Sequence, residues 1–330
     1  MKRRLKPQLS VYLLVAISLL EKFVIPGHCF QWNSKSRRPN FGTFLGGNNS
    51  PNLSPSGSSL VIVIPAYNEE DRLPETLRSY TSYLEELDIP CEIEILVVDD
   101  GSLDRTPAIA TQISERIPIN CISLSQNQGK GAALAKGIQF VKDRYCNDSC
   151  SNPDVLILTL DADGSGELRY VSEMLELLGF LLATTQHRGS LEGRLALVTG
   201  NRNYDIFSLR GILRGGFQAT VWLLTGGSLR VQDSQCGYKL MTLPTADLLY
   251  RDLNLQGWSH DVEVLYRASA FDIPIGQVSM DWKDKDGSKV IESGVVNVSL
   301  QMLFDVIYLR WSYLSGDWGL PQTKRNVKET

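Results

Sequence analysis

Short apolar runs alternate with segments of helical spacing between residues 60 and 180, and this alternation constrains the fold more than any other feature. The runs are short and rich in branched residues, as buried strands are. They cover residues 60–64, 93–98, 119–124 and 155–160. Apolar residues recur at helical spacing in the segments that follow them, which cover residues 73–87, 106–116, 132–141 and 168–180. This order predicts an α/β fold, in which a mostly parallel sheet carries helices on both faces.

Polar residues follow each apolar run, at the place where a parallel sheet binds its ligands. Open α/β sheets hold ligands in the crevice beyond the carboxyl ends of their strands. The segments in those positions are PAYNEE at 65–70, DDGS at 99–102, QNQGK at 126–130 and DAD at 161–163. We therefore expect functional residues in these four segments.

Aspartates in two of these segments favour a metal and nucleoside site. Asp161 and Asp163 flank one alanine, and carboxylates without histidine or thiolate partners suit a hard cation such as Mg²⁺ or Mn²⁺. A capped turn is an equally good interpretation of the DAD segment taken alone. Asp99 and Asp100 offer acceptors for a nucleobase and for ribose hydroxyls, and Gly101 lets the backbone approach a ligand.

Composition excludes several other classes of protein. The net charge is −4, but residues 1–59 hold eight Lys or Arg residues and one acid, so residues 60–330 are acidic, which argues against nucleic-acid binding. The six cysteines include no Cys-x-x-Cys pair and only three histidines accompany them, so we expect reduced thiols and no structural zinc site. The GKG segment at 129–131 has neither Walker nor GxGxxG spacing, which gives little support to dinucleotide binding.

The two ends of the chain differ in composition from its body. Residues 1–29 combine basic residues with a short uncharged run, which favours a signal peptide or a signal-anchor, with a buried N-terminal helix as the alternative. Residues 30–59 contain no acid and are rich in Ser, Asn, Gly and Pro, as expected of a disordered linker. We expect a single domain over residues 60–320 and a polar tail over residues 321–330.

The strand-end segments taken together point to a known family. Residues 65–70, 97–106, 127–131 and 161–163 resemble, in order and spacing, the inverting nucleotide-sugar glycosyltransferases of family 2. This resemblance implies a Rossmann-like GT-A fold and makes residues 60–320 a catalytic domain.

Three segments of the second half narrow the resemblance. Residues 233–239 (DSQCGYK), 257–266 (GWSHDVEVLY) and 281–289 (DWKDKDGSK) look like the dolichyl-phosphate β-glucosyltransferase branch of that family. The chain departs from the branch at His260, where an apolar or aromatic residue is usual, and in the charges of the third segment. These departures bear on the preference for donor or acceptor.

The resemblance implies an activity and a location. The chain would transfer glucose from UDP-glucose to dolichyl phosphate with inversion, for lipid-linked oligosaccharide assembly and protein N-glycosylation. It would act at the endoplasmic reticulum membrane, with the catalytic domain on the cytosolic face. The alternatives are a polyprenyl-phosphate mannosyltransferase that uses GDP-mannose and a non-catalytic scaffold that binds a nucleotide sugar.

The resemblance also implies roles for individual residues. The nucleotide side of the site would be lined by Pro65, Ala66, Tyr67, Glu69, Asp99, Gln128, Lys130 and Asp161. Asp161 and Asp163 would hold Mg²⁺ or Mn²⁺ on the diphosphate. Arg202 and Lys239 would clamp the acceptor phosphate, because Arg binds phosphate bidentately and Lys binds it as a point charge.

Two acids in the second half complete the expected site. Asp261 opens a helical segment, so an N-cap is its simplest role. The phosphate acceptor already carries negative charge, so we expect Asp261 to orient the acceptor, the sugar or a clamp rather than to remove a proton. We expect Asp233 to help fix Lys239.

A lipid acceptor predicts a surface that meets a membrane. In residues 297–314 the polar residues fall on one narrow stripe and apolar or aromatic residues cover most of the remaining circumference. Residues 208–224 combine basic and aromatic residues. We expect these C-terminal amphipathic helices to lie in a bilayer interface, with packing on the sheet as the alternative.

Overall fold

The structure is a computed structural model. It describes residues 29–31, 58–87, 91–113, 116–146, 155–185, 195–203, 209–225, 227, 231–282 and 295–321. The expected leader and linker therefore lie outside the described residues except at 29–31 and 58–59, and the expected tail lies outside them except at 321.

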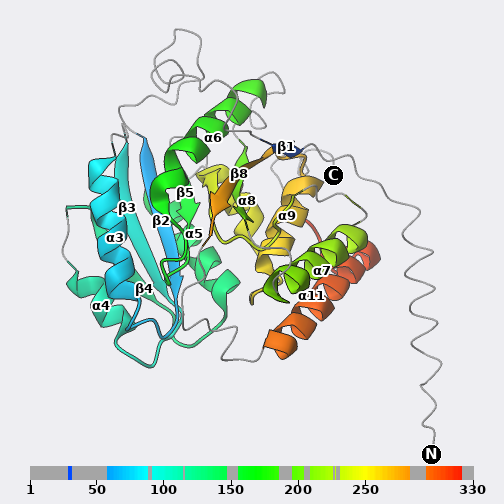
Figure 1. Ribbon diagram of the computed structural model, residues 1–330, viewed down its shortest axis with the longest axis horizontal. Coiled ribbons are helices and arrows are strands. Elements are labelled where there is room, and N and C mark those ends of the chain that lie inside the picture. Colours follow the sequence, from blue (N-terminus) through cyan, green and yellow to red (C-terminus); the bar gives the residue numbers. More distant parts are fainter. Residues whose placement is uncertain are drawn as a thin grey trace, which may run out of the picture.

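One eight-stranded sheet organises the described chain, in the order β1-β8-β6-β7-β5-β2-β3-β4 (Figure 1). Its strands are β1 (Cys29–Gln31), β2 (Ser59–Ala66), β3 (Glu92–Asp99), β4 (Ile119–Ser123), β5 (Val155–Thr159), β6 (Leu197–Asn203), β7 (Lys239–Thr242) and β8 (Ile275–Asp281). Only β7 runs antiparallel to its neighbours, β5 and β6, among the described strands. The expected α/β fold with a mostly parallel sheet is confirmed.

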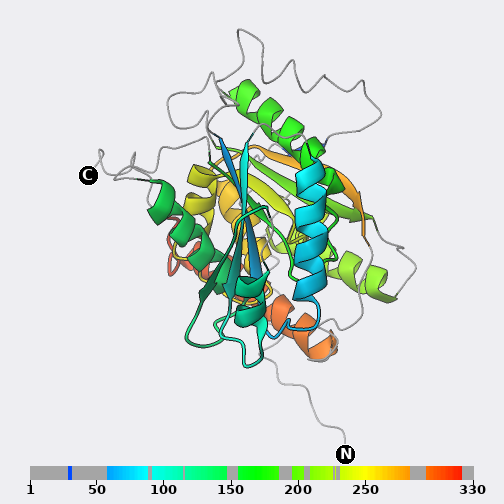
Figure 2. The ribbon, with the colours of Figure 1, turned by 90° about the vertical axis from the view of Figure 1, so that its left-hand side faces the viewer.

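Helices cover both faces of this sheet. They are α3 (Leu73–Glu86), α4 (Thr106–Gln112), α5 (Lys130–Tyr145), α6 (Val171–Thr185), α7 (Leu209–Leu224), α8 (Leu243–Tyr250), α9 (His260–Ala270) and α11 (Val295–Ser315). One buried cluster joins the sheet to α3, α4 and α6, and the other joins it to α5, α8 and α9. Figure 2 shows the sheet nearly edge-on, with α3 on one side and α5 on the other.

The alternation along β2 explains why the first half of the chain could be interpreted from its sequence. Leu60, Ile62 and Ile64 belong to one buried cluster, whereas Val61 and Val63 belong to the other. A strand covered on both faces needs apolar side chains at every position, because successive residues point to opposite faces. The eight residues of β2 are accordingly all buried.

The structure also differs from the expected elements in several places. Helix α4 ends at Gln112, before the expected residue 116, and a 3₁₀ turn over Leu168–Tyr170 precedes α6. Strand β1 pairs in parallel with β8, although the sequence pattern indicated a leader and a linker there. Its three residues are too few to show a period.

Helices α7 and α11 pack against each other at the end of the molecule that lies away from β4 (Figure 1). No helix in the described ranges has both the length and the apolar content that a membrane crossing requires.

Candidate active site

The loops that follow β2 and β3 are fastened to each other by hydrogen bonds. Asn68 donates its backbone N–H to Ser102 Oγ at 2.9 Å, and its side-chain oxygen accepts from the backbone N–H of Leu103 at 2.9 Å. Glu69 N–H donates to Thr106 Oγ1 at 2.8 Å. These bonds place the two polar loops beside each other at the carboxyl end of the sheet, as the sequence predicts.

Asp100 joins the loop after β3 to the start of α5. Its two carboxylate oxygens accept from the backbone N–H groups of Gln128 and Gly129, each at 2.8 Å. Burial raises its pKa, although these two donors act in the opposite direction. Gly129 has φ +101°, and a Cβ there would lie 2.6 Å from the Gln256 carbonyl oxygen, so the junction requires glycine. Asp99, which precedes Asp100 in the chain, is 2% exposed and accepts a hydrogen bond from the Ser102 backbone N–H at 3.0 Å.

The residues expected on the nucleotide side differ in how accessible they are. Pro65 and Ala66 are buried at the end of β2, Tyr67 is half-buried beyond them, and Gln128 is exposed. The Glu69 carboxylate receives two bonds from Arg72, at 2.7 and 2.6 Å. The Glu69 carboxylate is therefore held by Arg72 and stabilises the loop that follows β2.

Lys130 and Asp161 form an ion pair between the start of α5 and the end of β5. Lys130 Nζ lies 2.5 Å from Asp161 Oδ1. Burial acts to lower the pKa of Lys130, but the Asp161 and Asp261 carboxylates raise it overall, so the ammonium is charged. On the same loop, Asp163 Oδ1 accepts from Ser165 N–H at 2.9 Å and from Ser165 Oγ at 2.6 Å.

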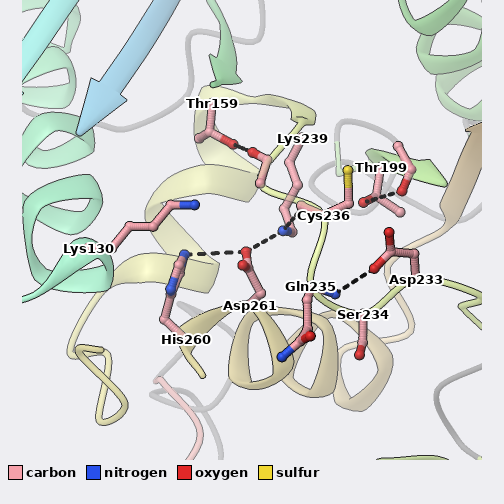
Figure 3. Close-up of polar contacts among 12 residues, drawn as sticks. Lys130, Thr159, Thr199, Asp233, Ser234, Gln235, Cys236, Lys239, His260 and Asp261 are labelled. Atoms are coloured by element: carbon pink, nitrogen blue, oxygen red, sulfur yellow. Dashed lines mark hydrogen bonds and ion pairs between the residues drawn. The ribbon is translucent and has the colours of Figure 1, made fainter. Parts of the chain in front are cut away.

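The antiparallel strand β7 brings the segment 233–237 against this ion pair. Thr159 Oγ1 donates to the Gly237 carbonyl at 2.6 Å, which fixes Gly237 to the end of β5 (Figure 3). A Cβ on Gly237 would lie 2.7 Å from Asp161 Oδ1 and 3.0 Å from Lys130 Nζ. Glycine is therefore what lets the backbone pass so close to the Asp161 carboxylate.

We expect Gly237→Ala to lower enzymatic activity by about tenfold to 10²-fold with little change in stability. The added methyl would displace the ends of two side chains rather than backbone, and a misplacement of about 1 Å in a catalytic site can cost about 10²-fold. The measurement is kcat beside the thermal midpoint. Gly179→Ala is the matched control, because a Cβ there meets nothing within 4 Å. Equal kcat values for the two variants would contradict this role of Gly237.

Arg202 and Asp233 form the second ion pair of the site. Arg202 lies in β6, and its Nε and one terminal nitrogen donate to the two Asp233 oxygens at 2.6 and 2.9 Å. Burial acts to raise the pKa of Asp233, but Arg202 lowers it overall. The Arg202 guanidinium also lies 5.2 Å from the centre of the Trp282 ring. The expectation that Asp233 fixes Lys239 is wrong, because Arg202 is its partner.

Lys239 and Asp261 form the third pair, in the interior. Lys239 is 0% exposed, and its Nζ donates to the Cys236 carbonyl at 2.5 Å and to Asp261 Oδ1 (Figure 3). Burial acts to raise the pKa of Asp261, but His260, Lys239 and Lys130 lower it to about 2. Asp261 is not the N-cap residue of α9, because the residue at the N-cap position is Ser259.

The enclosure of Lys239 changes its expected role. With its ammonium bound to Asp261 and to the Cys236 carbonyl, Lys239 holds the 233–237 segment rather than facing a ligand. Burial raises the pKa of the Cys236 thiol to about 11, so this thiol is protonated at neutral pH and is no nucleophile.

Sequence reasoning found most of the acids and bases of the site, but it gave no role to Asn68 or Gly237, and it expected Asp100 to accept from a ligand, whereas its carboxylate accepts from the backbone N–H groups of Gln128 and Gly129. The signal for Asn68 and Asp100 lay in their segments, since short polar side chains next to glycine commonly bond backbone N–H groups. Gly237 lies in the DSQCGYK segment that the resemblance singled out, but the sequence does not show why glycine is needed there, because the close approach of Asp161 depends on how β7 enters the sheet.

The carboxylates present suit a hard cation that is shared with a phosphate ligand. The described residues contain no group of three His, Cys, Asp or Glu side chains placed to hold a metal ion. Asp161 and Asp163 offer two carboxylates on one strand-end loop. Mg²⁺ and similar ions commonly take one or two carboxylates and complete their shell with waters and substrate phosphates. The pair therefore fits such a cation.

Comparisons with known sequences agree with this geometry. Residues 61–183 match the family model described as glycosyl transferase family 2. The chain is 33% identical over 273 residues to a dolichyl-phosphate β-glucosyltransferase of Dictyostelium discoideum, covering 78% of this chain and 76% of the relative. It is 33% identical over 272 residues to the enzyme of the same name from Homo sapiens, covering 81% of this chain and 79% of the relative.

Solved structures share the fold at low sequence identity. Glucosyl-3-phosphoglycerate synthase from Mycobacterium tuberculosis, in complex with Mn²⁺, UDP and phosphoglyceric acid, aligns with a TM-score of 0.56 at 18% identity. The alignment covers 91% of this chain and 89% of that one. The same enzyme with Mg²⁺ and UDP aligns with a TM-score of 0.54, covering 85% of each chain. At this identity the likeness establishes the GT-A fold alone.

Proposed function

Because the chain belongs to the dolichyl-phosphate β-glucosyltransferases of glycosyltransferase family 2, we propose that it transfers glucose from UDP-glucose to dolichyl phosphate with inversion. The observation that carries this proposal is that the segment 233–237 joins two ion pairs: Gly237 lies against the Lys130–Asp161 pair, and Asp233 pairs with Arg202. Asp163 lies on the same loop as Asp161. Such a site offers carboxylates for a cation and cations for phosphates.

The donor would bind over the fastened loops that follow β2 and β3. Tyr67 and Asp99 lie there with the backbone that carries Gly101, which suits a base and a ribose. Asp161 and Asp163 would hold a divalent cation, which supplies positive charge to stabilise the leaving diphosphate. Lys130 is placed to move from Asp161 to the diphosphate when the donor arrives, since a charged ammonium can exchange one anionic partner for another.

The acceptor would approach from the side of Arg202. Its phosphate oxygen attacks the anomeric carbon, the bond from that carbon to the diphosphate oxygen breaks, and the electron pair leaves with UDP. The Arg202 bonds to Asp233 use two of the three guanidinium nitrogens, so Nη1 remains to meet an acceptor phosphate. Because that phosphate is largely ionised near neutral pH, a protein base is not needed.

Helix α11 supports a lipid acceptor because it exposes a row of large apolar side chains. Asp305 accepts from Ser259 Oγ at 2.7 Å, and Ser312 is fully buried. Six large apolar side chains of the helix are 40–65% exposed, namely Leu300, Phe304, Ile307, Tyr308, Trp311 and Leu314. They recur at helical spacing, and a continuous exposed apolar face of this kind suits a bilayer interface.

The same helix reaches the site. Met302 Sδ lies 3.7 Å from Gln235 Nε2, in the segment that carries Asp233, and Ser259 is adjacent to His260. We propose that α11 rests in the bilayer interface and that the acceptor phosphate reaches Arg202 from there.

We expect Phe304→Ser with Trp311→Ser to weaken binding to phospholipid vesicles by at least about tenfold. Burial of one large apolar side chain contributes about 1.5–3 kcal/mol, and both residues are more than half exposed. The measurement is co-sedimentation with vesicles, with Phe140→Ser on α5 as the control. Unchanged vesicle binding would contradict a membrane role.

The activity is tested with radiolabelled UDP-glucose, dolichyl phosphate and Mn²⁺ or Mg²⁺. Formation of a glucosylated lipid supports the proposal, whereas tighter calorimetric binding of GDP than of UDP would point to GDP-mannose as the donor. Product configuration tests inversion.

We place the reaction at the cytosolic face of the endoplasmic reticulum membrane, in the supply of sugar for protein N-glycosylation. The names of the relatives support the reaction, and the sequons that begin at Asn48, Asn52, Asn147 and Asn297 provide the test of sidedness. Glycosidase-sensitive mass on the native protein would contradict the cytosolic face.

A further inference from the structure

His260 is a buried histidine whose protonation pattern is constrained by its neighbours. It is the first residue of α9 and is 0% exposed. Its Nδ1 lies 2.9 Å from the Gly257 carbonyl oxygen. A carbonyl oxygen only accepts hydrogen bonds, so Nδ1 must carry a hydrogen.

The other ring nitrogen then faces a carboxylate without a hydrogen to share. Nε2 lies 3.3 Å from Asp261 Oδ1 and makes no hydrogen bond among the described residues (Figure 3). In the neutral ring, Nε2 presents a lone pair to an anionic oxygen, which is unfavourable. A proton on Nε2 would turn the same contact into a charge-assisted hydrogen bond.

The oxygen that Nε2 faces is also the one that Lys239 uses. Lys239 Nζ donates to Asp261 Oδ1, so a protonated His260 would compete with Lys239 for a single acceptor atom. Lys239 in turn holds the Cys236 carbonyl, and the next residue, Gly237, lies against Asp161. The protonation of His260 can therefore affect the position of the segment 233–237, which lies against the loop that carries Asp161 and Asp163.

Charged and aromatic groups from four elements surround His260. They are Asp261 on its own helix, Lys130 on α5, Lys239 on β7 and the Tyr250 ring on α8, whose centre lies 6.4 Å from that of His260. Burial lowers the pKa of His260, and Lys130 and Lys239 act in the same direction against Asp261. Gly131 on α5 closes the site, since a Cβ there would lie 2.6 Å from His260 Cβ.

We propose that His260 is a positioning residue that sets the pH range in which Asp261 holds Lys239. Neutral His260 leaves Asp261 Oδ1 to Lys239, which keeps Gly237 against Asp161. Protonated His260 takes a share of that oxygen and adds a positive charge, which loosens Lys239. The expected effect of His260 on reaction rates rests on the proposed function.

The first test compares pH profiles of kcat/KM for the donor between the wild type and His260→Asn. Asn keeps a donor for the Gly257 carbonyl and removes Nε2. The ratio of wild type to variant should be constant above pH 7 and fall by about three- to tenfold as the pH is lowered below 6.5 and His260 takes up its proton, as one extra ionisation predicts. Ionisation of the acceptor phosphate is common to both proteins and cancels in the ratio. A ratio that is constant at every pH would indicate a purely structural role and overturn the proposal.

The second test needs no turnover. The chain has three histidines, so ¹⁵N spectra of the full-length protein can assign His260 by its loss in His260→Asn. The neutral ring should carry its hydrogen on Nδ1 and take a second proton below the ordinary histidine pKa of 6.5. Hydrogen on Nε2 in the neutral ring would overturn the proposal. The expected titration in a protein that transfers no glucose would contradict the proposed function and leave the role of His260 supported.

Stability provides a check against misfolding of the variant. Because burial lowers the folded-state pKa of His260, the unfolded chain binds more protons below pH 6.5, and wild-type stability should fall there as pH falls. His260→Asn should lack this part of the fall in its thermal midpoint. His260→Gln, which places an amide near Nε2, should also show no extra ionisation. If the thermal midpoint of both variants fell below pH 6.5 as much as that of the wild type, the proposal would be overturned.

Discussion

Asp163→Asn is expected to lower kcat for glucosyl transfer by about 10²-fold or more while the protein stays folded. The substitution removes one carboxylate charge from the loop after β5, and loss of one preorganised electrostatic contact typically costs 10²- to 10³-fold. Asn keeps an oxygen that can accept from Ser165 N–H and Ser165 Oγ, so the loop conformation should survive. The measurement is kcat as a function of Mn²⁺ or Mg²⁺ concentration, beside the thermal midpoint.

The control for this variant is Asp143→Asn. Asp143 is an exposed acid of α5 that accepts from Gln139 Nε2 at 2.6 Å, so the change in net charge is the same without a change in the loop. Normal activity of Asp163→Asn, or full wild-type activity in excess chelator, would contradict a metal role for Asp163.

Arg267→Leu is expected to destabilise the protein by about 3–5 kcal/mol. Arg267 is 1% exposed and donates to the Glu263 carboxylate at 2.7 Å, and its other bonds reach the Leu249, Arg251 and Asp252 carbonyls and Tyr313 Oη. Its removal leaves Glu263 buried at 0% exposure without its cation, and a broken buried pair costs about this much. The measurement is the free energy of unfolding from urea denaturation.

Arg144→Leu provides the comparison for Arg267. The Arg144 side chain is 49% exposed and pairs with Glu94 at 2.9 Å, and an exposed ion pair contributes about 1 kcal/mol or less. Similar losses in the two variants would show that the buried network around Arg267 adds nothing beyond a surface pair.

The fold could be predicted over the first half of the chain because short apolar runs alternate regularly there with segments of helical spacing. Strands β2 and β5 are buried along their whole lengths and read as apolar runs. Strand β7 has four residues and begins with Lys239, which no hydrophobic pattern would place in a core. Strand β6 ends in polar residues that contribute Arg202 to the site, so its own pattern is mixed.

The site could be predicted by residue type but not by partner. The sequence singled out Arg202, Asp233, Lys239 and Asp261, yet it paired Asp233 with Lys239. Which cation meets which acid depends on the antiparallel entry of β7 between β5 and β6, which places Lys239 inward toward α9 and leaves Asp233 beside β6. Local sequence patterns cannot predict that geometry, because Arg202 and Asp233 are 31 positions apart and Lys239 and Asp261 are 22 positions apart.

The three-residue strand β1 has a consequence for how the chain can be trimmed. It occupies the outer side of β8 through the register pairs Cys29–Ile275, Phe30–Gly276 and Gln31–Gln277. An uncovered strand edge offers free N–H and C=O groups to any other chain, which promotes edge-to-edge aggregation. Proteolytic removal of residues up to 31 would open that edge of β8. A soluble truncated protein should therefore begin before Cys29.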